Sequence, residues 1–248
     1  MTRTRTIALA LVAVAALAVG GYIAYDQVLR GDDVAALALP TQPRASADPS
    51  PPAASPGAAS SAPATETRVG GEWQVGSDSV AGYRVREQLA NLPAESDAIG
   101  RTSEVTGSIT VESAGDGARL TAGTLNVDTT TITSDESRRD NRLRSEGLQT
   151  DQFPAATFEV TQPVDVPAAA LAGTATDITL VGDLTLHGVT KSVQIPAQAQ
   201  LADGRIQVAG SLNFALADFD ITAPNVGGFI ISIADEGALE FLVSFEKA

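Results

Sequence analysis

Apolar residues recur at every second position along much of the chain after residue 71, and this alternation restricts the fold more than any other sequence feature. Four long segments place Leu, Ile, Val, Phe or Gly at alternate positions, with mostly polar or small residues between them: 105–111, 178–186, 206–216 and 239–245. Successive side chains of a strand point to opposite faces of a sheet. Each segment is therefore predicted to be a strand with one buried face.

Short turn sequences connect the predicted strands. Glycine-containing turns lie at 115–117, 187–188 and 203–204, and such turns are typical of antiparallel hairpins. Roughly eight strand segments fit into the region after residue 71. A sheet of this size can close into a barrel or fold into a sandwich, and the alternation is compatible with both.

The predicted inward faces contain four glycines among medium-sized aliphatic residues: Gly107, Gly123, Gly182 and Gly210. An eight-stranded barrel has an interior that side chains just fill or that holds one small ligand. Glycines among Leu, Ile and Val are compatible with an apolar cavity for an elongated ligand. They are equally typical of bulges and tight corners in a filled barrel, so the residues alone leave both interpretations open.

One basic segment interrupts the strand pattern. Residues 137–144 contain four arginines, in an acidic chain of formal net charge −14. Asp135 or Ser137 can cap a short helix here, and Gly147 can end it before an extended segment begins at Pro154. The helix is expected to be either a functional lid on the β domain or a chain crossing whose charges face water.

The N-terminus has the pattern of a membrane anchor. Arg3 and Arg5 precede an uncharged, apolar run over residues 7–25, which as a helix would be about as long as the hydrocarbon core of a bilayer is thick. The positive-inside rule places residues 1–6 in the cytoplasm and the rest of the chain outside. The run is longer than the apolar core of a cleaved signal peptide, which favours an uncleaved anchor, whereas cleavage would give a secreted domain.

Residues 26–67 are predicted to be a linker. From residue 40 onward this segment is largely Pro, Ala and Ser and has no large apolar side chain. It cannot bury enough surface to offset the entropy lost on ordering, so we expect a disordered, semi-extended tether. The β domain is accordingly expected to occupy residues 68–248.

The composition excludes several classes of function. The chain has no cysteine and one histidine, which excludes disulfides and thiolate chemistry and argues against a metal site. The negative charge argues against nucleic acid as a partner. Nucleophile-elbow, phosphate-loop, zinc-protease and dinucleotide motifs are absent from the sequence. We therefore expect a binding protein without catalytic residues, cofactor or metal.

Four segments of the sequence resemble the YceI-like, polyisoprenoid-binding family. They are residues 137–145 with Phe153, Pro154 and Phe158; the hairpin GDLTLHGVTK at 182–191; FALADFDI at 214–221; and an opening strand formed by Trp73 and residues 79–86. The resemblance covers about residues 71–247, and the first two of these segments are the specific ones. The chain departs from the family pattern between residues 88 and 104, after Pro224, and at Asp220, where glycine is usual.

The resemblance implies an all-β fold, namely an extended, lipocalin-like antiparallel barrel of eight strands with a short helix between strands. It implies a barrel, exported from the cytoplasm, that holds an isoprenoid or similar long-chain amphiphile in its interior. A phosphorylated headgroup would suit Arg138, Arg139 and Arg142, although these arginines could instead pair with nearby acids and hold the helix. The ligand tail is expected to contact Leu125, Val127, Phe158, Leu184, Leu186, Leu212, Phe214 and Phe241.

Two other functions are compatible with the sequence. Asp218 and Asp220 are predicted to share a strand face, like the paired acids of an envelope enzyme that acts on a lipid or a glycan. His187 is the only histidine available as a base, but it is expected at a hairpin turn, where a solvated side chain is typical. The other alternative is a ligand-free envelope domain used for protein contacts.

Overall fold

The computed structural model describes residues 34–40, 69–89, 95–223 and 230–248, so the predicted anchor at 7–25 and most of the predicted linker lie outside the described residues. Within these ranges, no helix combines the length and the hydropathy that crossing a membrane requires. The chain divides into two units, and the second unit, Leu37–Ala248, contains all the elements described below.

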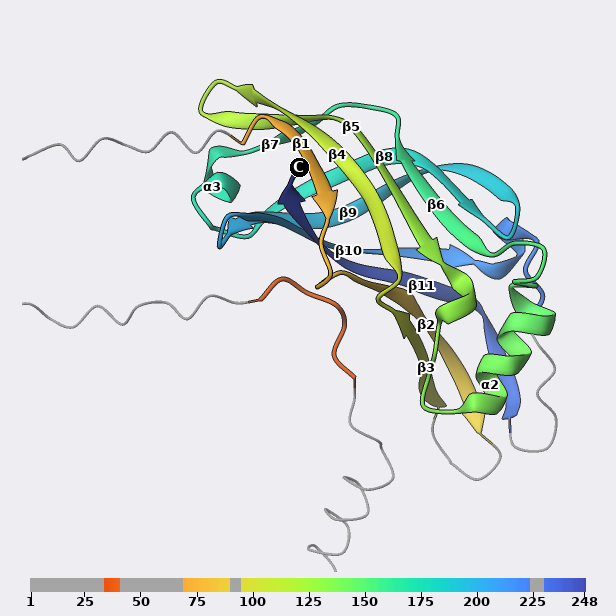
Figure 1. Cartoon of the computed structure of the whole chain (residues 1–248). Coiled ribbons are helices and arrows are strands. Elements are labelled where there is room, and N and C mark those ends of the chain that lie inside the picture. The colour runs from red at the N-terminus through yellow and green to blue at the C-terminus, as the bar shows by residue number, and fades with distance from the viewer. Residues whose placement is uncertain (1–33, 41–68, 90–94, 224–229) are drawn as a thin grey trace, which may run out of the picture. The chain divides into compact units, whose positions relative to one another are not determined.

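The second unit is built from β-strands with a few short helical elements (Figure 1). The strands are β1 (Gly71–Val75), β2 (Val80–Leu89), β3 (Glu95–Thr102), β4 (Val105–Ala114), β5 (Gly117–Asp128), β6 (Ala155–Val160), β7 (Val164–Val166), β8 (Thr176–Leu186), β9 (Val189–Ala202), β10 (Arg205–Ala215) and β11 (Ile230–Lys247). The helical elements are η1 (Thr129–Thr131), α2 (Ser137–Arg142), η2 (Leu143–Gly147), α3 (Ala168–Leu171) and η3 (Leu216–Phe219).

The strands form a closed antiparallel barrel. Hydrogen-bonded neighbours follow the order β1-β4-β5-β6-β8-β9-β10-β11, and β11 also pairs with β1, which closes a ring of eight strands. The long strand β11 pairs with β1 at residues 245–247 and with β2 along residues 230–242. β3 extends the sheet beyond β2. The predicted all-β, eight-stranded barrel is therefore confirmed, and the sandwich alternative is wrong.

The alternating apolar faces meet inside this barrel. Leu125 on β5 is the register partner of Phe158 on β6, which in turn pairs with Leu184 on β8. Phe158 and Leu184 are buried, and Leu125 packs against the same core. The period of two found in the sequence thus brings residues from strands far apart in the chain onto one inner wall.

The inward glycines accommodate neighbouring atoms rather than open space. A Cβ atom at Gly182 would lie 2.2 Å from the Glu159 carbonyl oxygen and 2.6 Å from the Phe158 ring. At Gly210 it would lie 2.6 Å from the Phe241 ring and 2.9 Å from a backbone carbonyl oxygen. At these two positions the absence of a side chain makes room for an aromatic ring of an adjacent strand, so the glycines do not open a cavity there.

The basic segment forms a helix, as predicted, but with a different cap. Glu136 has an extended backbone, and its side chain accepts a hydrogen bond from the Arg138 backbone N–H at 3.0 Å. Asp135 pairs instead with Arg139, so neither Asp135 nor Ser137 caps α2. The helix continues into the wider turn η2 and ends at Gly147, as expected.

A short part of the predicted linker lies within the barrel unit. Leu39 is buried, and the Gln200 side-chain amide on β9 donates a hydrogen bond of 3.4 Å to the Pro40 carbonyl oxygen. Residues 34–40 form neither helix nor strand. Residues 37–40 therefore pack as part of the same unit as the strands.

Candidate ligand-binding cavity

The interior of the barrel contains a partly open cavity with an almost entirely apolar lining. Its free volume is about 180 Å³, enough for roughly a dozen water-sized groups. All eight residues predicted to contact a ligand tail line this space: Leu125, Val127, Phe158, Leu184, Leu186, Leu212, Phe214 and Phe241. An apolar void of this size is suited to an apolar chain and unfavourable for water.

A second, smaller apolar void continues the interior towards α3. It has a volume of about 60 Å³. The wall between the two voids includes Phe158, Leu180 and Phe241, each of which lines both. The barrel interior therefore holds two apolar voids that are separated by side chains they share.

The helix α2 and the turn η2 lie at one end of the barrel, while α3 lies at the opposite end (Figure 1). Arg139, Leu143, Gly147 and Leu148 line the cavity. Arg139, Leu143 and Gly147 recur at intervals of four residues, so they share one face of the helical segment, and Leu148 follows at its end. The segment is thus a lid with one face turned towards the cavity.

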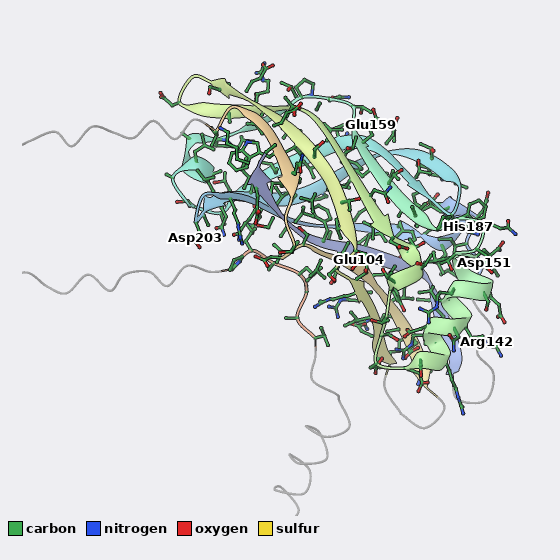
Figure 2. The ribbon with its side chains drawn as sticks, in the orientation of Figure 1. Glu104, Arg142, Asp151, Glu159, His187 and Asp203 are labelled. Atoms are coloured by element: carbon green, nitrogen blue, oxygen red, sulfur yellow. The ribbon has the colours of Figure 1, made fainter. Side chains whose placement is uncertain are left out.

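The three arginines that were predicted to bind a headgroup do not all face the cavity. Arg139 lines the cavity, whereas Arg138 is exposed and neither it nor Arg142 belongs to the cavity lining. Arg142 forms an ion pair with Glu146 one turn further along, at 2.7 Å. Figure 2 shows Arg142 on the outer side of the lid. The structure therefore places one arginine, not three, at the cavity.

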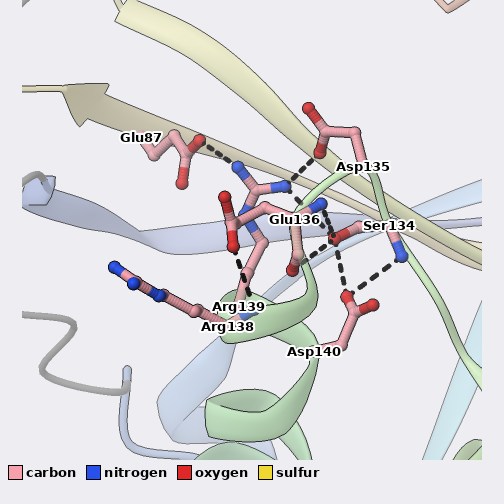
Figure 3. A network of polar contacts seen from close by, with 7 residues as sticks. All are labelled: Glu87, Ser134, Asp135, Glu136, Arg138, Arg139 and Asp140. Carbon is pink, nitrogen blue, oxygen red and sulfur yellow. Dashed lines mark hydrogen bonds and ion pairs between the residues drawn. The ribbon is translucent and has the colours of Figure 1, made fainter.

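A buried ion pair joins the lid to the barrel wall. Arg139 Nη2 lies 2.6 Å from Glu87 Oε1 on β2, and only 3% of Glu87 is exposed. Arg139 Nη1 contacts Asp135 and the Ser134 hydroxyl. Figure 3 shows the guanidinium held between the carboxylates of Glu87 and Asp135. Asp140, also buried, accepts hydrogen bonds from the Ser134 backbone N–H and hydroxyl and fixes the loop before the helix.

Burial dominates the electrostatics at this end of the cavity. It raises the pKa of the Tyr83 hydroxyl to about 12, despite the nearby Arg139 charge. It also raises the pKa of Glu87, because the cost of desolvation exceeds the attraction of Arg139. Burial opposes the charge on Arg139, but Glu87 and Asp135 raise its pKa above the ordinary value. The polar end of the cavity is thus a low-dielectric site.

Tyr83, Glu87 and Ser96 were not predicted from the sequence to be site residues. A signal was nevertheless present in β2, because Tyr83, Val85 and Glu87 occupy the same alternating phase as the buried Ala81. A glutamate in the inward phase of a strand is unusual. Ser96 lies in the stretch that departs from the family pattern, and that stretch contains β3.

The expected placement of the paired acids of an alternative enzyme is wrong. Asp218 and Asp220 do not share a strand face, since β10 ends at Ala215 and both acids lie at the exposed turn that follows. Asp218 forms an ion pair with Lys191 at 2.7 Å, and the lysine lowers the pKa of this carboxyl group.

His187 is not a solvated turn residue. Its Nδ1 atom lies 3.0 Å from the Phe219 carbonyl oxygen, and its ring packs edge-on against Phe153 with 4.6 Å between centroids. The residue does occupy the predicted hairpin turn, where it and Gly188 both have positive φ angles, as a tight hairpin of this type requires. Among the described residues, no group of acidic or histidine side chains could hold a metal ion.

We expect the stability difference between the native protein and Glu87→Gln to change with pH. The pKa of Glu87 is raised above its ordinary value of 4.5, so the unfolded chain releases this proton at a lower pH than the folded protein does. The stabilisation from the protonated carboxyl is complete below pH 4.5 and is lost as the pH rises through the folded pKa.

The native protein should therefore lose stability relative to Glu87→Gln on going from pH 4 to pH 7, by about 1.4 kcal/mol for each tenfold difference in proton affinity between the folded and unfolded states. Urea unfolding of both proteins across this range measures the difference, with the Trp73 fluorescence as the signal. A difference that stays constant or increases with pH would show that the attraction of Arg139 exceeds the cost of burial.

Comparisons with known proteins agree with this architecture. Residues 75–245 match the YceI-like domain family. UPF0312 proteins of Vibrio parahaemolyticus and Shewanella denitrificans are 35% and 34% identical over 111 and 133 residues, which cover 42% and 50% of this chain. The matched segments span only 55% and 63% of those relatives.

A solved structure shares the fold. A polyisoprenoid-binding domain from Saccharophagus degradans, implicated in plant cell wall breakdown, matches with a TM-score of 0.55 and 21% sequence identity. The match covers 71% of this chain and 98% of that domain. At this level of identity the likeness shows a common barrel fold.

Proposed function

The chain belongs to the YceI-like domain family, and we propose that it is a lipid-binding protein that holds an isoprenoid-type or similar long-chain amphiphile inside its barrel. The observation that carries this proposal is the apolar cavity inside the barrel, which is lined by side chains of the inner wall. The fold shared with a polyisoprenoid-binding domain supports the choice of ligand class.

The energetics favour a long apolar chain. Each buried methylene contributes about 0.8 kcal/mol, so a tail of ten carbons gives roughly 8 kcal/mol before the cost of association, which is at least about 4 kcal/mol. Filling the second void as well would increase this gain. Most of the binding energy is expected from the tail, with the polar end of the ligand determining orientation and specificity.

We also propose that the barrel is held at a membrane, outside the cytoplasm, by residues 7–25. Arg3 and Arg5 before the apolar run support this orientation. A carrier placed there would take its ligand from the adjacent bilayer. The envelope enzyme has little support by comparison, because Asp218 is engaged with Lys191 at the exterior of the domain.

One experiment tests both parts of the proposal. The full chain is expressed in a bacterial host, spheroplasts are treated with a membrane-impermeant amine reagent, and the protein is purified from the membrane fraction. We expect labelling of Lys191 and Lys247 on the barrel, and we expect a long-chain lipid to be released on organic extraction and identified by mass spectrometry. A cytoplasmic lysine-rich protein serves as the unlabelled control.

The labelling result tests the proposed location, and the lipid extraction tests the binding function independently of it. Labelling that requires lysis of the spheroplasts would contradict the proposed location. Extraction of the purified protein without any lipid above the level of an unrelated membrane protein, together with failure to take up added isoprenoid alcohol, would contradict the binding function.

A further inference from the structure

Three buried polar atoms near the α2 end of the cavity have no hydrogen-bond partner among the described residues. They are Glu87 Oε2, Arg139 Nε and Ser96 Oγ. Glu87 and Arg139 line the cavity, and Ser96 is the register partner of Glu87 across β2 and β3, which places their Cβ atoms about 5 Å apart. Buried polar atoms of native proteins nearly always have partners. Two such atoms on side chains that line the cavity, with a third on the strand beside Glu87, are the basis for inferring a polar group on the ligand.

The chemistry of the three atoms determines which hydrogen bonds that ligand group must make. A carboxylate oxygen only accepts hydrogen bonds, a guanidinium N–H only donates them, and a hydroxyl does both. A ligand group that satisfies Glu87 and Arg139 together must contain a donor and an acceptor close to one another. Ser96 can bond to either.

The charge balance at this end argues against an anionic group. The single guanidinium of Arg139 already faces two carboxylates, those of Glu87 and Asp135. A phosphate beside Arg139 would lie close to Glu87 in a region of low dielectric, where repulsion between like charges is strong. The other basic side chains of α2 do not line the cavity, so they do not offset this repulsion.

We propose that Glu87, Ser96 and Arg139 form a headgroup site for a neutral polar group that both donates and accepts hydrogen bonds, such as an alcohol or a carboxamide. This inference rests on the proposed function and adds the chemistry of the ligand's polar end. It replaces the phosphate that the arginine cluster suggests from the sequence. The tail then extends from α2 along the apolar wall towards the second void.

A competition experiment with the full chain tests this site. The protein in detergent micelles is equilibrated with equal amounts of geranylgeraniol, geranylgeranyl phosphate and the corresponding hydrocarbon, and the bound species are counted by native mass spectrometry. The readout is the change in the ratio of bound ligands between variants, because partitioning into micelles is then the same for every protein compared.

We expect Ser96→Ala to lower the ratio of bound alcohol to bound hydrocarbon about fivefold, since the alcohol loses one buried hydrogen bond. Glu87→Gln should raise the ratio of phosphate to alcohol at least tenfold, because the carboxylate that repels phosphate is gone. Arg142→Gln is the matched control on the outer side of the same helix and should leave both ratios unchanged.

Three results distinguish failure of this inference from failure of the proposed function. Ligand binding with the same ratios in all variants would place the headgroup elsewhere and overturn the inference, while the tail-binding function would stand. A phosphate that binds best and depends on Arg142 would also overturn it, in favour of an anionic headgroup. If no protein retains any of the three ligands, the proposed function itself is wrong.

Discussion

Replacing Ala98 with leucine is expected to weaken the binding of a long-chain isoprenoid alcohol about fifty-fold. Ala98 is a buried residue of β3 whose side chain lines the larger cavity. Leucine would fill space needed by roughly three ligand methylenes, which amounts to about 2.4 kcal/mol at 0.8 kcal/mol each. Competition binding against the native protein measures the loss, and Ala156→Leu provides an independent test at a second lining position.

A matched control separates the loss of cavity volume from damage to the barrel. Ala118 is buried to a similar extent but lines only the smaller void near α3. Leucine at Ala118 should cost stability by overpacking, about 1–3 kcal/mol as at Ala98, yet change the binding of an isoprenoid alcohol short enough to occupy only the larger cavity less than about threefold. Equal losses for Ala98→Leu and Ala118→Leu would show that binding follows the stability of the barrel and not the volume of the larger cavity. Gly210 is unsuitable for this test because any larger side chain would collide with backbone.

Replacing Arg139 with methionine is expected to lower the free energy of unfolding by about 3–5 kcal/mol. The substitution keeps an apolar stem in the lid but leaves Glu87 as a buried carboxylate that has lost its nearest cation. Removing one partner of a buried pair has a cost of this size. Urea unfolding of a chain beginning at residue 37, which contains the whole barrel unit, measures the effect through the fluorescence of the buried Trp73.

The double variant Glu87→Leu with Arg139→Met should regain most of the lost stability, because two apolar side chains replace the pair and no charge is left buried. Arg142→Met is the control on the same helix, and its exposed pair with Glu146 should contribute no more than about 1 kcal/mol. If Arg139→Met is no more destabilising than Arg142→Met, the lid is not fastened through Glu87. The arginine would then act on the ligand alone.

Much of the barrel could be predicted from the sequence because the information is local. The alternation in segments such as 178–186 shows which side chains are buried, since successive residues of a strand face opposite ways. The turn was predicted from Gly188 between two alternating segments, and in the structure both His187 and Gly188 have the positive φ angles that such a turn requires. The alternation places Leu184, Leu186, Leu212, Phe214 and Phe241 on inward faces, whereas Phe158 was named from the family resemblance; all eight expected tail contacts line the cavity.

The residues at the headgroup end of the cavity could not be predicted from the sequence, because their contacts join segments that are far apart in the chain. The arginine-rich helix presents several faces, and the sequence does not state which one turns inward. Arg139 is the arginine that turns inward, because it pairs with Glu87, 52 residues away in the chain. Arg142 pairs with Glu146, only four residues further along. The orientation of a short helix is set by the side chains against which it packs, and these come from distant strands.

The size of the cavity was likewise decided only by the tertiary structure. The inward glycines were compatible with open space or with a filled barrel, and in the structure aromatic rings from neighbouring strands occupy the space beside Gly182 and Gly210. The void lies instead between the wall and the lid, where side chains from strands and helix meet without filling the volume. A sequence specifies which residues face inward. Whether their volumes fill the interior depends on how the closed barrel brings them together in three dimensions.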